Sequence, residues 1–342
     1  MSQAQIAVVI LNWNGRTFLQ KFLPSVFFHT PEWVNVVVAD NGSTDDSVRF
    51  LKDQYPQVKL IELHKNHGYA GGYNLALQQI EAEYFVLLNS DIEVTEQWLE
   101  PLIDYLESNK QVAAIQPKML SWHQRKHFEY AGASGGFIDL LGFPFCRGRI
   151  FNVLEKDNGQ YDDGTEVLWA TGACLVVRSE AFWQAGGFDD RFFAHFEEID
   201  LCWRLKNKGW AVSVVPQSAV YHVGGGTLPK NNPLKTFLNF RNSLWCLAKN
   251  LPSRFFYPLI PIRLSLDIAA AFVFLFKGQL RDFTAVFRAH FAFFANFIKL
   301  RKQNSNRPHK LPSGVLRGSI VFSRYFAGIK VFSKLNIKKL GL

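Results

Sequence analysis

Short apolar runs alternate with stretches of helical periodicity along the first hundred residues of the chain. Buried strands are expected at residues 6–11, 35–39, 58–63 and 85–89. Helices are expected at residues 17–28, 47–54, 75–80 and 96–108. Strands that alternate with helices are typical of an α/β fold with a mostly parallel sheet. The pattern continues more loosely, with strands predicted at 112–116 and 212–215, and loops with short strands between 132 and 164.

The strand that begins at Phe85 runs directly into Asn89, Ser90 and Asp91. In open α/β sheets the carboxyl ends of the strands form the ligand-binding edge. A carboxylate at that edge suits Mg²⁺, which takes one or two protein carboxylates and fills its other positions with water and phosphate oxygens. The three polar residues could also do no more than open a turn, because Asn, Ser and Asp dominate turns.

A glycine-rich segment, NHGYAGGYN at residues 66–74, precedes the helix expected at 75–80. Glycines before a helix allow the backbone to approach a phosphate group and present helix N–H groups to it. The segment matches neither the GxGxxG fingerprint of dinucleotide-binding folds nor a phosphate loop ending in GK[ST]. A tight turn explains it equally well.

Three carboxylates, Glu197, Glu198 and Asp200, lie within four residues and follow a Phe-rich stretch. Acidic residues favour the first turn of a helix, so a solvated helix start is one interpretation. The neighbouring aromatic residues favour partial burial instead, which would raise a carboxyl pKa and suit a general base. His222 precedes the triple glycine Gly224 to Gly226, where the ends of several strands could converge.

With these segments laid out, the chain resembles the inverting GT-A enzymes of glycosyltransferase family 2, and within them the bacterial rhamnosyltransferase-like members. The resemblance covers roughly residues 4–250. It depends on five motifs in the expected order: VVILNWNG, VVVADNGSTDDS, NHGYAGGYN, LLNSD and WATGACLVVRSEAFWQAGGFDDRFFAHFEEIDLCWR. It implies a GT-A fold, a Rossmann-like mixed and mostly parallel sheet flanked by helices.

The resemblance also implies roles for individual residues. Asp40 would accept a hydrogen bond from a uracil or thymine imide, and Asp91 would bind Mg²⁺ or Mn²⁺, with His222 as a further metal ligand. Glu198 would be the general base that deprotonates the acceptor hydroxyl, with Glu197 and Asp200 in the same acidic cluster. The other donor-binding residues implied are Asn12, Asn14, Asn66, Gly68, Gly71, Gly72, Asn74, Asn89 and Gly172.

Two positions depart from the family pattern. The metal motif often reads Asp-x-Asp, whereas its first position here is Asn89, whose neutral amide binds Mg²⁺ more weakly. The acidic pair often reads Glu-Asp, whereas here it is Glu197-Glu198, so either glutamate could be the base. The chain has no QxxRW motif of the processive synthases. The transfer of a single sugar from a UDP- or dTDP-sugar, with dTDP-rhamnose as one candidate, is therefore favoured.

Charge is distributed unevenly along the chain. Residues 230–342 carry 20 Lys and Arg but only two acidic residues, whereas the preceding part carries 18 Lys and Arg and 27 Asp and Glu. Such a split indicates a region that faces a polyanion, either nucleic acid or an anionic membrane. The four cysteines show no CxxC spacing, which argues against a zinc site and favours a reducing cytoplasm.

The basic region is also rich in phenylalanine. Residues 255–276 are strongly apolar but contain Arg263 and Asp267, which would make a simple membrane span costly. A stripe of apolar side chains follows at helical spacing between Phe283 and Ile298, with basic residues nearby. An apolar stripe with a basic flank is typical of an interfacial membrane helix. The same stripe could instead pack on the catalytic domain or on a partner chain.

These observations predict two parts, a nucleotide-sugar glycosyltransferase domain at 1–250 and a basic, helical, membrane-associating region at 251–342. We expect a peripheral protein on the cytoplasmic face of the cell membrane that acts on a lipid-linked or cell-surface glycan acceptor. A basic nucleic-acid-binding protein is the main alternative, but the basic region lacks a recognised binding motif, so nucleic acid is not expected as a partner. A sugar nucleotidyltransferase is disfavoured, since residues 12–15 contain no basic residue to hold a triphosphate.

Overall fold

The computed structural model describes residues 5–224, 232–303 and 309–340. Its strands are β1 Ile6–Asn12, β2 Asn35–Asp40, β3 Lys59–Glu62, β4 Tyr84–Asn89, β5 Ile92–Val94, β6 Val112–Ser121, β7 Gly136–Asp139, β8 Pro144–Cys146, β9 Arg149–Ile150, β10 Val153–Leu154, β11 Thr165–Glu166, β12 Cys174–Arg178, β13 Ala211–His222 and β14 Val315–Leu316. Its α-helices are α1 Arg16–His29, α2 Ser47–Gln54, α3 Gly68–Leu77, α4 Glu100–Ser108, α5 Ser179–Gln184, α6 Glu197–Asn207, α7 Pro233–Asn250, α8 Ser253–Phe276, α9 Leu280–Gln303 and α10 Ile320–Tyr325. Short 3₁₀ helices occur at Asp190–Phe192, Phe332–Lys334 and Ile337–Leu340.

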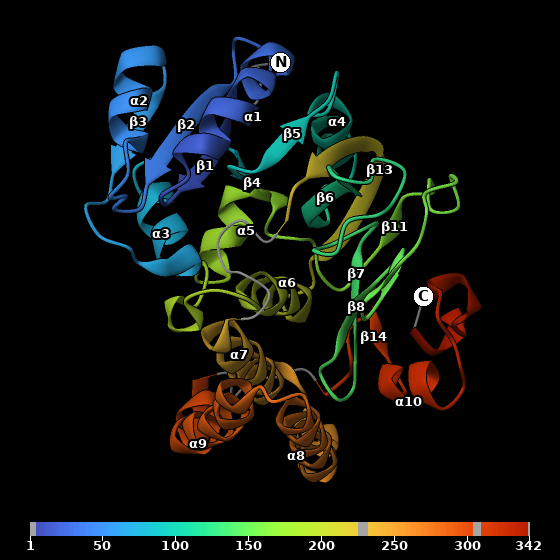
Figure 1. The fold of residues 1–342 in the computed structure, drawn as a ribbon. Coiled ribbons are helices and arrows are strands. Elements are labelled where there is room, and N and C mark those ends of the chain that lie inside the picture. Colours follow the sequence, from blue (N-terminus) through green and yellow to red (C-terminus); the bar gives the residue numbers. More distant parts are fainter. Residues whose placement is uncertain (1–4, 225–231, 304–308, 341–342) are drawn as a thin grey trace.

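A mixed sheet forms the centre of the molecule (Figure 1). Its strand order is β11-β13-β6-β12-β4-β1-β2-β3, and β5 pairs with β13. Strands β3, β2, β1 and β4 run parallel to their neighbours, and β12 runs antiparallel to both β4 and β6. This architecture confirms the predicted α/β fold with a mixed sheet flanked by helices.

The two faces of the central sheet are covered by different helices because side chains alternate along each strand. Val8 and Ile10 of β1 pack with apolar residues of α1, α2 and α4, whereas Ala7 and Val9 pack with α3, α5 and α6. Both faces are buried, so the strands read as continuous apolar runs in the sequence. In β1, β2 and β4 the polar side chains therefore gather at the strand ends.

A second, smaller sheet has the strand order β10-β9-β8-β7-β14. The rings of Phe137 and Phe145 pack against Phe332, with centroids 5.2 and 6.2 Å from it. Strand β14 runs parallel to β7, and the Ile320 N–H donates to the Asp139 carboxylate at 2.9 Å. Residues 309–340 therefore pack onto the body of the molecule. The prediction grouped them with the helical region after residue 250.

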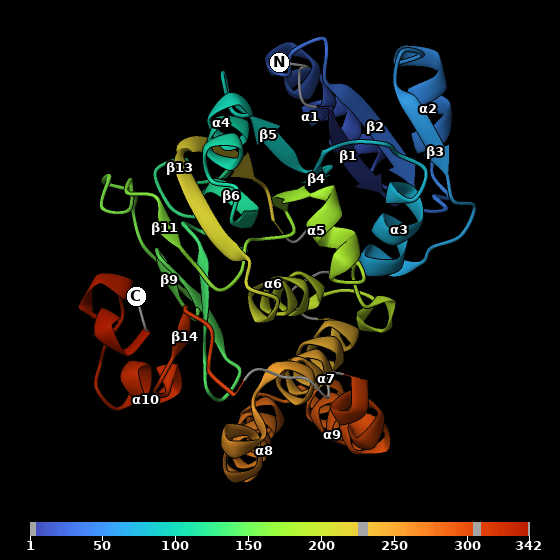
Figure 2. The same ribbon diagram turned by 180° about the vertical axis from the view of Figure 1, so that it is seen from behind.

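Helices α7, α8 and α9 form a layer below the body that contains the central sheet, and α7 lies between α6 and the other two (Figure 2). Helix α8 is continuous through Pro258 and Pro261. The two charged residues in its middle are buried, and the Arg263 Nε donates to Asp267 Oδ1 at 2.8 Å. His290 of α9 lies 3.3 Å from the other Asp267 oxygen. The charges in the middle of α8 thus face the protein and are paired.

The outer faces of α8 and α9 are apolar. The large hydrophobic side chains exposed there are Tyr257, Ile262, Ile268, Phe272, Val273, Phe276, Leu280, Phe287, Phe291, Phe294 and Ile298. Within the described residues, α8 is the one helix long and apolar enough to cross a membrane. Only 17% of its most apolar window is buried. In α8 a charged pair is buried and large apolar side chains are exposed. In the central sheet, by contrast, the apolar side chains are the buried ones.

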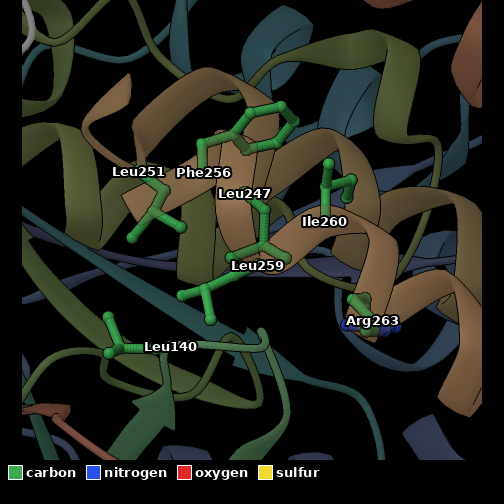
Figure 3. A pocket seen from close by; sticks show the side chains of 7 residues that line it. All are labelled: Leu140, Leu247, Leu251, Phe256, Leu259, Ile260 and Arg263. Carbon is green, nitrogen blue, oxygen red and sulfur yellow. The ribbon is translucent and has the colours of Figure 1, made fainter. Parts of the chain in front are cut away.

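A small apolar recess lies where α7 and α8 meet the loop after β7 (Figure 3). It is lined by Leu140, Leu247, Leu251, Phe256, Leu259, Ile260 and Arg263, and it has no room for a water molecule. The recess is therefore a feature of packing between the helical layer and the body.

Some expected element boundaries differ from the structure. Helix α3 begins at Gly68, so the glycine-rich segment lies inside the helix that was expected to start at 75. A Cβ on Gly72 would meet Leu11 and Asn41 at 3.0 Å, so tertiary packing demands small residues there and overrides their poor helix propensity. Strand β6 extends to Ser121, five residues beyond the prediction. Ser179 is the first residue of α5 and gives no side-chain cap.

Candidate active site

The ends of three neighbouring parallel strands bring polar side chains to one edge of the central sheet. In the register of β1, Asn12 pairs with Asp40 of β2, and Leu11 pairs with Asn89 of β4. All three polar residues close their strands. The predicted convergence of Asn12, Asp40 and Asn89 therefore follows from the parallel register.

Asp40 is buried and held in a fixed orientation at this edge. The Asn12 side-chain amide donates to one Asp40 oxygen at 3.1 Å, and the Ser43 backbone N–H donates to the other at 2.9 Å. Asn12 Oδ1 is buried and accepts no hydrogen bond within the described residues. A carboxylate and a free amide oxygen, both fixed by the sheet, provide acceptors for ligand N–H groups.

Asn14 shapes the loop that follows β2 without contacting Asp40. Its backbone is left-handed, with φ of 52°, and its side-chain oxygen accepts hydrogen bonds from the backbone N–H groups of Thr44 at 2.7 Å and Asp45 at 3.3 Å. Its own backbone N–H donates to Ser43 Oγ at 2.9 Å. The loop after β1 and the loop after β2 are thereby locked together around the strand ends.

The glycine-rich helix α3 lies beside these loops through an amide network. The Asn66 oxygen accepts from the Gly68 N–H at 2.8 Å, and the Asn41 amide donates to the Gly68 carbonyl at 3.0 Å. Gly68 has φ of 72°, and a Cβ there would come within 2.5 Å of Phe193. Asn66 and Gly68 thus hold the start of α3 against the segment that leads into α6.

Three of the predicted donor-binding residues make close contacts within the protein. Both polar groups of the Asn74 side chain bond the Phe188 backbone, at 2.8 and 3.0 Å. The Gly172 carbonyl accepts from the Tyr69 hydroxyl at 2.5 Å, and a Cβ on Gly172 would lie 2.7 Å from that hydroxyl. Gly71 lies against the His67 side chain. These residues position α3 against the loops that carry the acidic cluster.

Asp91, in the turn between β4 and β5, meets His222 at the end of β13, the strand that pairs with β5. His222 Nε2 lies 3.2 Å from Asp91 Oδ1, and both side chains are buried. The other ring nitrogen of His222 lies 3.2 Å from Glu129 Oε2. Burial alone would lower the pKa of His222, but the two carboxylates raise it well above its usual range. Burial alone would raise the pKa of Asp91, but the contact with His222 outweighs burial, so the pKa of Asp91 is lowered.

The donor set of Asp91 and His222 is one carboxylate and one imidazole, from strand ends that the sheet brings together. Within the described ranges, no group of three or more His, Cys, Asp or Glu side chains is arranged to hold a metal ion. Two protein ligands are compatible with a divalent ion that takes its remaining oxygens from water and a diphosphate. The residues present therefore fit a metal that binds together with a nucleotide ligand.

The acidic cluster begins helix α6, after a strained backbone segment. Phe193, His195 and Phe196 all have positive φ, between 64° and 72°. Non-glycine residues in this conformation are uncommon and concentrate at functional sites. The strained segment turns Glu197 and Glu198 into the protein, where the Oε2 atom of each is buried and accepts no hydrogen bond within the described residues.

Burial changes the protonation of both glutamates. It raises the pKa of Glu198 to about 7. It also raises the pKa of Glu197, by more, with the charge of Glu198 as a further cause. A carboxyl group that titrates near neutral pH and has a free oxygen matches the requirement for a general base.

Asp200 differs from its two neighbours because all its oxygens are paired. Its Oδ2 accepts from Lys249 and Arg204 at 2.8 Å each, and its Oδ1 accepts from the Asn250 amide at 2.8 Å. Burial raises the pKa of Asp200, but these cations outweigh it and lower the pKa. Asp200 thus joins α6 to α7, and both of its oxygens already accept hydrogen bonds from the protein.

Three residues near the site were not found by sequence reasoning. Tyr69 lies close enough to Glu197 and Glu198 for both charges to raise its pKa, after burial as the main cause. Glu129 contacts His222, and Arg149 is buried beside Cys146. Tyr69 belongs to a motif that the sequence already singled out. Glu129 and Arg149 lie in the stretch 110–165, whose short strands gave no periodic signal.

The chain matches a known protein family. The sequence profile described as glycosyl transferase family 2 matches residues 7–185. The chain belongs to this family. It is therefore a glycosyltransferase, and the family resemblance predicted from the motifs is confirmed. The match ends before α6, so the roles of Glu198 and His222 depend on the geometry described above.

Curated relatives of this glycosyltransferase act in glycan synthesis. An N-acetylglucosaminyl-diphospho-decaprenol L-rhamnosyltransferase of Mycobacterium tuberculosis is 28% identical over 232 residues, which cover 64% of this chain and 75% of that protein. The low-salt glycan biosynthesis hexosyltransferase Agl10 of Haloferax volcanii is 22% identical, over 72% of this chain and 75% of that protein.

Solved structures share the fold. GalNAc-T7 with UDP, GalNAc and Mn²⁺ superposes with a TM-score of 0.61 at 16% identity, covering 91% of this chain and 59% of that one. The S. aureus TarS fragment 1–349 in complex with UDP-GlcNAc gives a TM-score of 0.54 at 13% identity, covering 90% and 93%. At these identities the likeness concerns the fold alone, and it agrees with the predicted GT-A architecture.

Proposed function

We propose that this glycosyltransferase moves one sugar, with inversion, from a UDP- or dTDP-sugar to a lipid-linked glycan acceptor. The observation that carries the proposal is the pair of glutamates at the start of α6, each with a buried Oε2 that has no hydrogen-bond partner within the described residues. Glu197 is buried and Glu198 is half-buried, and burial raises the pKa of Glu198 to about 7. In a single displacement this carboxylate takes the acceptor proton while the hydroxyl oxygen attacks the anomeric carbon. The L-rhamnosyltransferase relative makes dTDP-rhamnose the first donor to test.

The residues at the strand ends bind different parts of the donor. Asp40 accepts the imide N–H of the base, and Asn12 offers its free oxygen beside it. Asp91 and His222 hold a divalent cation, which when bound neutralises charge on the leaving nucleoside diphosphate. Glu197 stays the second candidate for the base. Asp200 holds α6 in place, because Lys249, Arg204 and Asn250 occupy its oxygens.

The helical layer supports a peripheral position on an anionic membrane surface. Both acidic residues between 232 and 303, Asp267 and Asp282, are buried, whereas Arg281, Arg288 and Lys299 are exposed beside the apolar face. Such a surface gains from buried apolar area and from the negative charge of the cytoplasmic leaflet. A membrane-bound enzyme also meets a lipid-linked acceptor without extracting it into water.

The test is a screen of nucleotide sugars for nucleoside diphosphate release, with Mg²⁺ or Mn²⁺ and a polyprenyl-diphosphate-linked sugar as acceptor. We expect a UDP- or dTDP-sugar to be consumed only with the cation, and the new glycosidic bond to have the inverted anomeric configuration. Asp91→Ala should remove cation-dependent binding of the nucleoside diphosphate and leave the fold intact. Full activity in excess chelator would refute the metal role, and retention at the anomeric carbon would refute the role of Glu198.

Nucleic-acid binding remains the contrasting outcome for the basic region. A salt-dependent gel shift with the full chain, together with no release of any nucleoside diphosphate, would favour it. Family membership and the free glutamates both support the enzyme instead.

A further inference from the structure

Three arginines are buried in this molecule, within the described residues, and two of them have a carboxylate partner. Arg147 pairs with Asp163, and Arg263 pairs with Asp267. Arg149, which is only 4% exposed, forms no ion pair with any carboxylate in the part of the chain that the structure describes. A buried charge without a partner is strongly unfavourable, so an arginine of this kind calls for an anion from outside the protein.

The contacts that Arg149 does make are weak. One terminal nitrogen donates to the Phe151 carbonyl at 3.3 Å, and the other lies 3.3 Å from the Cys146 sulfur. The Nε atom is buried and has no hydrogen-bond partner. Burial raises the pKa of the Cys146 thiol, so the neighbouring sulfur stays protonated and does not neutralise the guanidinium. Most of the five N–H donors of Arg149 are thus left without an acceptor.

Arg149 lies within electrostatic reach of the proposed catalytic centre. It is close enough to Glu129 to interact with its charge, and Glu129 in turn contacts His222. The Cys146 thiol, which Arg149 touches, interacts with the charges of both Glu129 and Glu198. The guanidinium also lies over the half-exposed ring of Tyr130, 4.5 Å from its centroid. Arg149 therefore lies within electrostatic reach of Glu129, which contacts the metal ligand His222, and beside an aromatic ring at the surface.

We propose that Arg149 binds a phosphate group of the ligand, and that this phosphate belongs to the acceptor. A guanidinium fork with free donors matches the oxygens of a phosphate or diphosphate. Strand β9 of the second sheet lies on the side of the molecule that carries β13 (Figure 2), whereas Asp40, which binds the base of the donor, is on β2, on the far side of β4 from β13. This assignment rests on the proposed function, since it assumes that the nucleotide occupies the Asp40 side.

Binding to the full-length protein tests the proposal without any transfer reaction. Farnesyl diphosphate is the acceptor probe, farnesol is its neutral control for apolar binding, and UDP and dTDP with Mn²⁺ are the donor probes. Arg149→Met should weaken farnesyl diphosphate binding by about 10- to 100-fold, the effect of losing hydrogen bonds to a charged group. It should leave farnesol and nucleoside diphosphate binding within about twofold. Arg149→Lys, which keeps the charge but not the fork, should recover part of the loss.

Thermal stability separates a binding role from a structural one. Without ligand, Arg149→Met removes an unpaired buried charge, so its Tm should stay the same or rise. The matched control is Arg147→Met, two residues away on the same hairpin, which removes the bonds from the buried guanidinium to the Asp163 carbonyl and carboxylate and should lower the Tm without changing farnesyl diphosphate affinity.

The other outcomes are also informative. Loss of nucleoside diphosphate binding alone would overturn the assignment to the acceptor and move the phosphate to the donor. Unchanged binding of every probe, or a lowered Tm in Arg149→Met, would overturn the site itself. If the wild-type protein binds farnesyl diphosphate through Arg149 but no nucleoside diphosphate, the proposed function fails and the phosphate site stands.

Discussion

Helices α6 and α8 both bury ionisable side chains, but they do so in opposite ways. At the start of α6, Glu197 and Glu198 each keep one buried oxygen without a hydrogen-bond partner within the described residues. In the middle of α8, Arg263 and Asp267 bond each other, and Arg263 also donates to the Leu141 carbonyl and to Ser243 Oγ. Paired burial fixes the helical layer on the body, whereas unpaired burial leaves a carboxyl group available to a substrate.

The surroundings of the two helices are reversed as well. Around α6 the aromatic side chains point inward, with Phe192 and Trp203 fully buried. In the middle of α8 the charges of Arg263 and Asp267 point inward, whereas Phe272 and Phe276 point outward. The body therefore follows the rule for water-soluble proteins, and the helical layer follows the rule for a surface that faces an apolar environment.

The largest effect is expected from removing the unpaired base. Glu198→Gln keeps the shape of the side chain and removes its basicity, so transfer should fall by about 10²- to 10⁴-fold. Donor affinity should hardly change, as measured by titration with the nucleoside diphosphate. Glu197→Gln is the matched control on the same turn. If Glu197→Gln is the inactive variant and Glu198→Gln retains activity, the base is Glu197.

Breaking the Arg263–Asp267 pair of α8 should lower the stability of the protein and leave its catalytic activity unchanged. Asp267→Ala leaves Arg263 buried without its carboxylate and should lower the free energy of unfolding by roughly 3–5 kcal/mol. Chemical denaturation measures this loss. The double replacement Arg263→Met with Asp267→Leu removes both charges, so it should recover most of the stability. If the double variant is as unstable as Asp267→Ala, the loss of stability comes from losing the ion pair and not from leaving Arg263 without a partner.

The pH dependence of the reaction should report the unpaired carboxyl. Burial raises the pKa of Glu198 to about 7, and the base acts only when it is deprotonated. The rate should therefore fall about tenfold per pH unit below pH about 7 and level off above it. Glu197, Tyr69 and Cys202 lie near enough to interact with Glu198, so the apparent pKa belongs to the coupled group.

The same shift has a consequence for stability, with a defined sign. A group whose pKa is higher in the folded state stabilises the fold while it is protonated. For Glu198 this contribution is present below its ordinary pKa and is lost as the pH rises through about 7. Glu198→Gln should remove this slope from the stability curve. An unchanged slope in that variant would assign the titration to another group.

The sequence could predict those parts of the site that depend on local pattern. Asn12, Asp40, Asn89 and Asp91 follow apolar runs, so their position at the sheet edge follows from the strands alone. The pairing of Asp200 could not be predicted in this way, since Lys249 and Asn250 are about fifty residues away in the chain.

Other parts required long-range contacts that leave no periodic signal. Glu129 and Arg149 lie among very short strands, and one strand of their sheet, β14, comes from residues 315–316. The start of α3 was placed too late because its glycines are poor helix formers in isolation. Their helical conformation is imposed by packing against Leu11 and Asn41, which only the folded structure reveals.

The smallest expected effect concerns membrane binding. It tests whether the apolar outer faces of α8 and α9 contact a membrane. Phe291 and Phe294 on α9 are 77% and 59% exposed. Replacing both with serine removes apolar area from the outer face while the buried Arg263–Asp267 pair stays intact. Each lost aromatic contact with the bilayer interface weakens binding, so association with anionic liposomes should fall by about tenfold.

Phe28→Ser is the matched control for this pair. Phe28 is 84% exposed on α1 of the catalytic body, so its loss removes about as much apolar area as the loss of Phe291 alone, at a site that should not touch the membrane. We expect Phe28→Ser to sediment with liposomes like the wild type, and all variants to keep nucleoside diphosphate binding. Adding salt should weaken wild-type binding further, because the exposed basic residues beside the stripe are screened. If Phe291→Ser with Phe294→Ser binds liposomes normally but changes the oligomeric state, the outer face is an interface between protein chains, and the reversal seen in α8 and α9 serves assembly.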